Sequence, residues 1–128
     1  MDENEFWTLV DAGVDDPGVV EQRVKGMSEQ ELVDFYWLYQ DQIDELMDDE
    51  FAEVFGEDYS EGHHEDLATW VVRQGKAYFD GVVAAPETFP TELPKSTGPS
   101  YQTLVTREYK PRYGKLIRGQ DDPPPADA

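Results

Sequence analysis

Apolar residues recur at intervals of three, four and seven between residues 32 and 54, the longest periodic stretch of the chain. Ser28 and Glu31 form a capping-box pattern just before it, and no Pro or Gly interrupts it before Gly56. The pattern predicts one helix over about 29–55, with a break near 48–50 as the alternative. The periodic apolar positions are Leu32, Phe35, Tyr36, Tyr39, Ile43, Leu46, Met47 and Val54.

Two shorter helices are predicted before this stretch. Asp2 begins a capping-box pattern, and the apolar positions that follow it predict a helix over about 3–13. Asp16 can cap a second helix, Pro17 suits its first turn, and Gly26 can end it.

A further apolar stripe predicts a helix over about 63–84. Gly75 and Gly81 fall inside it, and each costs about 1 kcal/mol relative to Ala in a helix. We therefore expect close packing at these glycines, most simply against the helix over 29–55. The Pro-rich stretch 86–99 that follows argues against regular structure.

The last periodic stretch lies between residues 100 and 119. Its apolar spacing favours a helix in which Pro111 forces a kink or a stop, while 105–109 fits a short strand equally well. The sequence therefore predicts a single all-α domain of four or five helices over residues 1–119, with a Pro-rich irregular connection. A disordered acidic, Pro-rich tail is expected over 120–128.

Charge changes this picture more than composition does. The chain has 29 Asp and Glu against 10 Lys and Arg, a net charge of −19. Residues 1–94 hold 25 acids and 4 bases, and no Lys or Arg lies between Lys25 and Arg73. Such a surface repels nucleic acid phosphates and anionic lipid, which argues against direct binding to nucleic acid or membrane. It would attract a basic protein partner.

The outer face of the long predicted helix concentrates this charge. Trp37 lies off the main apolar stripe, among acids, which is the composition of a binding hot spot. We expect a non-enzymatic interaction module, of which an inhibitor or immunity-like role is one version. The expected partner-binding residues are Asp34, Trp37, Asp41, Asp44, Glu45 and Asp48.

The basic segment 95–118 carries six Lys and Arg against one acid, Glu108, and is interleaved with tyrosines. That mixture superficially suits nucleic acid. The alternative, which we prefer, is that the segment folds back on the acidic body of the same molecule.

The densest group of metal-binding side chain types is Glu61, His63, His64, Glu65 and Asp66, with His63, His64 and Glu65 at its centre. Adjacent histidines on a helix point about 100° apart, so we do not expect a metal site, cofactor or catalytic residue. A metal- or small-ligand-binding domain centred on this group is the alternative function.

The chain has no cysteine, so disulfides and thiolate chemistry are excluded. No apolar run reaches the length of a membrane span, and the start of the chain lacks the pattern of a secretory signal. A cytoplasmic protein is the expectation.

Two stretches resemble a known family. The first is Met1–Asp11, MDENEFWTLVD, and the second is Trp70–Pro86, WVVRQGKAYFDGVVAAP. They are similar to the uncharacterised bacterial domain-of-unknown-function 4240 family, in which E-F-W-x-L-[IV] opens the first helix and W-[LIV]-[IV]-x-Q-G-[RK]-x-x-[FY] follows later. Leu67 and Ala68 stand where family members have Phe-Arg. The resemblance implies a small, mostly helical intracellular domain and no particular reaction, ligand or partner.

Overall fold

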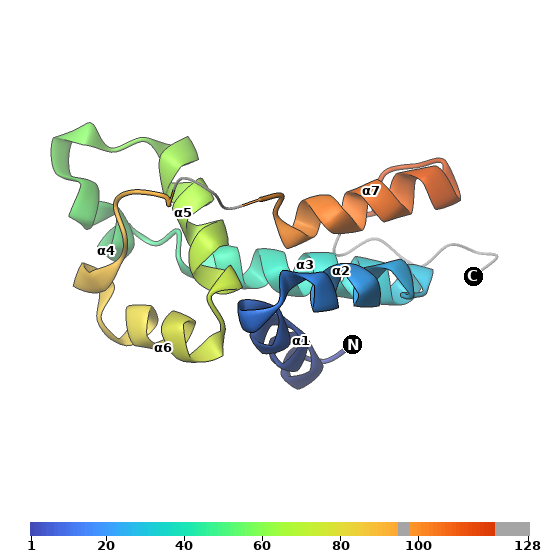
Figure 1. Ribbon diagram of the computed structural model, residues 1–128. Coiled ribbons are helices and arrows are strands. Elements are labelled where there is room, and N and C mark those ends of the chain that lie inside the picture. The colour runs from blue at the N-terminus through green and yellow to red at the C-terminus, as the bar shows by residue number, and fades with distance from the viewer. Residues whose placement is uncertain (95–97, 120–128) are drawn as a thin grey trace.

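The computed structural model describes residues 1–94 and 98–119, whose regular secondary structure is all helical, with no strand among them (Figure 1). The α-helices are α1 (Glu3–Asp15), α2 (Pro17–Lys25), α3 (Glu29–Glu45), α4 (Asp49–Ala52), α5 (Glu61–Arg73), α6 (Lys76–Ala84) and α7 (Tyr101–Tyr113). Two 3-10 helices, η1 (Glu53–Asp58) and η2 (Pro86–Thr88), complete the described part. The all-α class is confirmed, but seven α-helices replace the predicted four or five.

Side-chain caps start the first three helices, as the sequence predicts. The Asp2 carboxylate accepts from the backbone N–H of Glu5, and the Asp16 carboxylate accepts from that of Gly18. Ser28 and Glu31 form a reciprocal capping box at the start of α3. Each cap satisfies a backbone donor that has no partner inside its helix.

The prediction of one helix over 29–55 is wrong, and the chain breaks close to the alternative position. Helix α3 ends at Glu45, Leu46 is its C-cap, and α4 begins at Asp49. The Leu46 carbonyl, freed at the helix end, accepts a hydrogen bond from the Nε2 of His64 at 2.7 Å. This long-range partner stabilises the break because it satisfies a buried carbonyl group.

The predicted helix over 63–84 is also wrong, because the chain turns at Gln74 and Gly75 between α5 and α6. Gly75 has a φ of +102°, a conformation that L side chains rarely adopt. It approaches Asp11 and Val14 of α1, not the long helix. Gly81 has open space where a Cβ would lie, so the predicted close packing at Gly81 is also wrong.

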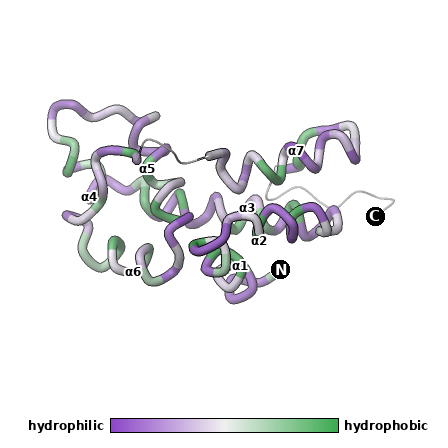
Figure 2. Tube along the Cα trace, viewed as in Figure 1, coloured by the Kyte–Doolittle hydropathy of each residue, from purple (hydrophilic) through white to green (hydrophobic). Residues whose placement is uncertain are grey.

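The core lies between α1, α2, α3, α5 and α7, and Figure 2 shows hydrophobic and hydrophilic residues interleaved along the helices. Phe6 packs against Phe35 and Tyr39 with ring centroids 5.5 and 5.9 Å apart, and Tyr39 packs edge-on against Tyr101 at 6.2 Å. Trp7 is also buried, and its ring packs edge-on against Phe6 at 5.1 Å. This aromatic cluster holds α3 in the centre of the fold.

Residues 101–113 form helix α7, which packs on α2 and α3 (Figure 1). The preferred prediction of a helix here is confirmed, and the alternative of a short strand over 105–109 is wrong. Pro111 lies inside α7 without stopping it, and Gly114 caps the end in the left-handed conformation. Arg112 donates to the Met27 carbonyl and pairs with Glu108. The predicted fold-back is thus confirmed for α7, which packs on α2 and α3, and for Lys115, which lies 3.9 Å from Glu29 of α3.

The predicted tail, 120–128, and Lys95 lie outside the described residues. Within 1–94 and 98–119, none of the helices combines the length and the apolar content that a bilayer crossing requires.

Candidate functional site

The expected partner-binding residues lie along α3 and just beyond its C-terminal end. Asp41, Asp44, Glu45 and Asp48 are exposed, whereas Asp34 and Trp37 are partly buried. We call the six residues together the acidic face. Its two ends differ in what they contact within the molecule.

The N-terminal end of the acidic face is engaged by other parts of the chain. The Asp34 carboxylate accepts from the Met1 ammonium group at 2.9 Å and from Gln30 Nε2 at 2.7 Å. The Trp37 indole N–H donates to the Arg118 carbonyl at 2.9 Å. A cavity of about 220 Å³ remains beside these groups. Trp37 is therefore partly covered, where the sequence suggested an exposed anchor.

The C-terminal end of the acidic face is open. Asp44 accepts from Gln40 Nε2 at 2.9 Å, which is a helical i,i+4 contact. Asp44, Glu45 and Asp48 take part in no ion pair within the described residues. Their negative charges therefore face solvent and repel one another, because the stretch 26–72 contains no Lys or Arg.

The His63–Glu65 group does not converge on one point. His64 is fully buried, and its Nδ1 faces the Tyr59 hydroxyl at 3.1 Å while its Nε2 donates to Leu46. His63 donates through Nε2 to the Thr91 carbonyl at 2.7 Å. Both nitrogens carry the hydrogen because a carbonyl oxygen only accepts. Across the described ranges, no three His, Cys, Asp or Glu side chains gather as a metal-binding group.

Glu65 instead lines a cleft of about 410 Å³ together with Thr69, Trp70, Arg73 and Gln102. The Arg73 guanidinium donates to the Pro99 carbonyl at 2.7 Å and lies 4.5 Å from the centroid of the Tyr101 ring. Sequence reasoning missed this cleft because α5 and α7 are distant in the chain. The one signal for it was Trp70, which belongs to the family-like motif.

Tyr39 also lines this cleft and donates its hydroxyl hydrogen to the Thr69 carbonyl at 2.8 Å. Burial raises the pKa of Tyr39, and burial likewise raises the pKa of Tyr101. Both phenols therefore remain protonated at neutral pH and act as hydrogen-bond donors.

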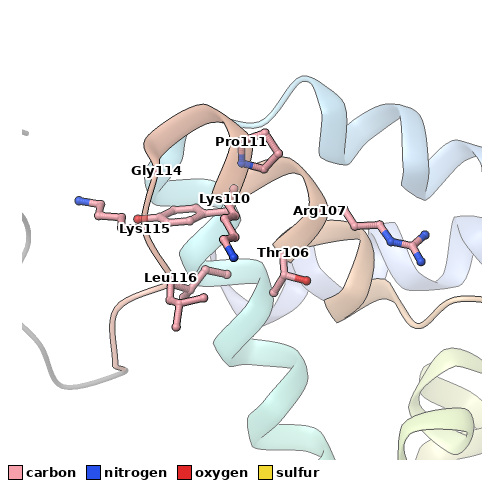
Figure 3. A pocket seen from close by; sticks show the side chains of 9 residues that line it. Thr106, Arg107, Lys110, Pro111, Gly114, Lys115 and Leu116 are labelled. Atoms are coloured by element: carbon pink, nitrogen blue, oxygen red, sulfur yellow. The ribbon is translucent and has the colours of Figure 1, made fainter.

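A second depression, of about 770 Å³, lies between α7 and the chain that follows it (Figure 3). Arg107, Lys110 and Lys115 line it beside Pro111 and Leu116, and Leu116 is 76% exposed. In Figure 1 the C-terminal end of α7, whose residues line this groove, and α4 lie at opposite ends of the molecule. The basic residues near the C-terminus and the acidic residues of α4 are therefore separated in space as well as in sequence.

The fold and these surfaces define an acidic, all-helical domain with a basic groove at one end. The family model for "Protein of unknown function (DUF4240)" matches residues 1–110, so the chain belongs to the DUF4240 family. The resemblance carried by the two sequence stretches is thereby confirmed. No curated protein and no solved structure matches the chain.

Proposed function

We propose that this domain is a cytoplasmic, non-enzymatic interaction module that binds a basic protein through the acidic face. The residues that engage the partner are those predicted from the sequence: Asp34, Trp37, Asp41, Asp44, Glu45 and Asp48.

One observation carries the proposal: Asp44, Glu45 and Asp48 are exposed and have no ion-pair partner among the described residues. Asp44 and Glu45 lie in the last turn of α3, where the negative end of the helix dipole repels a carboxylate by about 0.3–1 kcal/mol. A basic partner would convert this repulsion into attraction and speed encounter by electrostatic steering.

An inhibitor or immunity-like role is the concrete form of this proposal. Acidic inhibitors of basic nucleases use complementary charge to associate quickly and to exclude wrong partners. Such a role requires an exposed acidic surface on a rigid scaffold, and α3 is held by the buried cluster around Phe35 and Tyr39.

The test compares partner capture from an extract of the source organism by two variants of equal charge. Asp44→Asn/Glu45→Gln/Asp48→Asn neutralises the open end of the acidic face. Asp15→Asn/Glu87→Gln/Glu92→Gln neutralises three exposed acids outside α3. We expect one stoichiometric basic protein to bind the wild type and the control, to be released by moderate salt, and to be lost from the first variant. Equal retention by both variants, or no basic partner at all, contradicts the proposal.

The cleft lined by Glu65, Trp70 and Arg73 supports a second candidate, binding of a small ligand. It combines a carboxylate, an aromatic ring and a guanidinium group in one concave site, which is the chemistry of many ligand pockets. This candidate keeps Glu65 from the sequence-based alternative and leaves out the two histidines. A thermal-shift screen against metabolites tests it, with Trp70→Ala as the variant that should abolish any stabilisation found.

A further inference from the structure

The segment Gly114–Gly119, which we call the return segment, leaves the end of α7 and runs onto α3 without forming a helix or strand. Its Arg118 carbonyl accepts from the Trp37 indole at 2.9 Å, and its Arg118 guanidinium donates to Gln30 Oε1 at 2.7 Å. Lys115 Nζ lies 3.9 Å from a carboxylate oxygen of Glu29. These contacts join residues 81–88 positions apart.

The side chains of the return segment follow the pattern of an extended peptide on a surface. Ile117 is partly buried against the core, whereas Leu116 beside it is 76% exposed. Lys115 and Arg118 flank this pair and contact polar groups of α3. Affinity in such a mode comes from a main-chain hydrogen bond and one apolar anchor, and specificity from the charged side chains.

We propose that the N-terminal end of the acidic face is a docking site for an extended basic segment, and that the return segment occupies this site in cis. The partner would present an aliphatic residue followed by Arg, with its main-chain carbonyl on Trp37 and its cations on Glu29 and Gln30. This inference rests on the proposed function, for which it specifies both the form of the partner and a competing contact within the chain.

The cavity beside Arg118 also favours a partner segment that carries positive charge. It measures about 220 Å³, and Asp34 and Asp41 contribute to its lining. A partner segment that replaces the return segment therefore meets carboxylates next to the position of Arg118. A second cationic side chain would be favoured there by charge.

Competition in cis predicts a measurable effect. A tethered segment acts at an effective concentration in the millimolar range, so a free peptide of similar sequence competes poorly with it. Loosening the return segment should therefore raise the affinity for such a peptide while leaving α3 unchanged.

The experiment uses two full-length variants that do not alter charge. Ile117→Ser removes the partly buried anchor, and Leu116→Ser removes its exposed neighbour as the matched control. The readout is the NMR resonance of the Trp37 indole N–H, assigned with Trp37→Phe. The probe is a capped synthetic peptide with the sequence of residues 114–119, GKLIRG.

We expect Ile117→Ser to shift the Trp37 indole resonance towards its solvent-exposed position and to bind the probe about five- to tenfold more tightly than wild type. Addition of the probe should then move the resonance back. Leu116→Ser should behave as wild type. An Ile117→Ser resonance that is unchanged, or that shifts but does not respond to the probe, overturns the inference.

The two proposals fail differently. If the inference alone is wrong, the Ile117→Ser variant ignores the probe, yet neutralising Asp44, Glu45 and Asp48 still abolishes capture of the basic partner. If the proposed function is wrong, that neutralisation has no effect on capture, whatever the Trp37 resonance shows. Retention of the helical circular dichroism spectrum by both serine variants excludes unfolding as the cause.

Discussion

The Asp11 carboxylate accepts a hydrogen bond from the backbone N–H of Lys76 at 2.8 Å, across 65 positions of the chain. Lys76 is the first residue of α6, and its N-cap, Gly75, has no side chain to offer. Asp11 of α1 therefore takes the part of a capping residue for a helix that follows much later. The contact also joins the two stretches that carry the family resemblance.

Asp11→Ala should destabilise the protein by about 1 kcal/mol, the usual cost of losing an N-cap side chain. The loss should appear as a lower midpoint of urea unfolding with an unchanged slope. Asp15→Ala is the control, because Asp15 is exposed at the end of the same helix and caps none. Equal effects of the two substitutions would contradict the capping role of Asp11.

Gly75→Ala should destabilise the fold by about 1–3 kcal/mol because φ at this position is +102°. A Cβ would also lie 2.8 Å from the Asp11 carboxylate and 3.2 Å from Val14 Cγ2. Gly81→Ala lies in α6, where a Cβ meets open space, and should be neutral or stabilising by up to about 1 kcal/mol. The thermal unfolding temperatures of the two variants are compared. A loss in Gly75→Ala alone indicates local backbone strain, whereas a loss in both would contradict it.

His64→Ala should destabilise the protein by about 2–4 kcal/mol, because it leaves the Leu46 carbonyl without its partner and creates a cavity. His63→Ala removes a partly exposed ring and should cost less. Chemical unfolding of both variants gives the comparison. An equal and small effect would mean that the His64 contact does not hold the junction between α3 and α4.

Tyr109→Phe should flatten the loss of stability at alkaline pH. Burial, followed by a hydrogen bond to the Glu29 carboxylate at 2.9 Å, raises the pKa of Tyr109 to about 12. The unfolded chain ionises first, near pH 10, so the stability that this phenol contributes is present below that pH and is lost as the pH rises towards 12. Unfolding measured between about pH 9 and 12 should show a shallower decline in the variant. An unchanged decline would mean that Tyr109 ionises equally in both states.

Neutralising the open end of the acidic face should stabilise the fold while abolishing partner capture. In Asp44→Asn/Glu45→Gln/Asp48→Asn, we expect a higher unfolding temperature than wild type at low ionic strength, because like-charge repulsion is relieved. The difference should shrink at about 1 M salt, where charges are screened within about 3 Å. No gain at low salt would show that these carboxylates do not strain the helix end.

Local signals in the sequence predicted the helix starts well. Asp2, Asp16 and Ser28 each act within three residues of their own position, so no tertiary information was needed. The two helix breaks could not be predicted in this way. One depends on His64, 18 positions from Leu46, and the other on Asp11 approaching Gly75. Apolar spacing continues across both breaks and conceals them.

The acidic face likewise could be predicted only as far as local sequence determines it. Its acids and Trp37 could be placed on one helix from their spacing, and α3 does carry them. The covering of Trp37 by Arg118 could not be foreseen, because it joins positions 81 residues apart. The cleft beside Trp70 was missed for a similar reason, since its walls come from separate helices.

The placement of the caps has a consequence for the order of folding. Helices α1, α2, α3, α5 and α7 each begin with a side chain that reaches its own first turn. The local sequence therefore stabilises the first turn of each of these helices before any tertiary contact forms. Helix α6 has no such local cap, because its acceptor arrives only when α1 has docked. We therefore expect the structure of α6 to be absent from the folding transition state and to form after it.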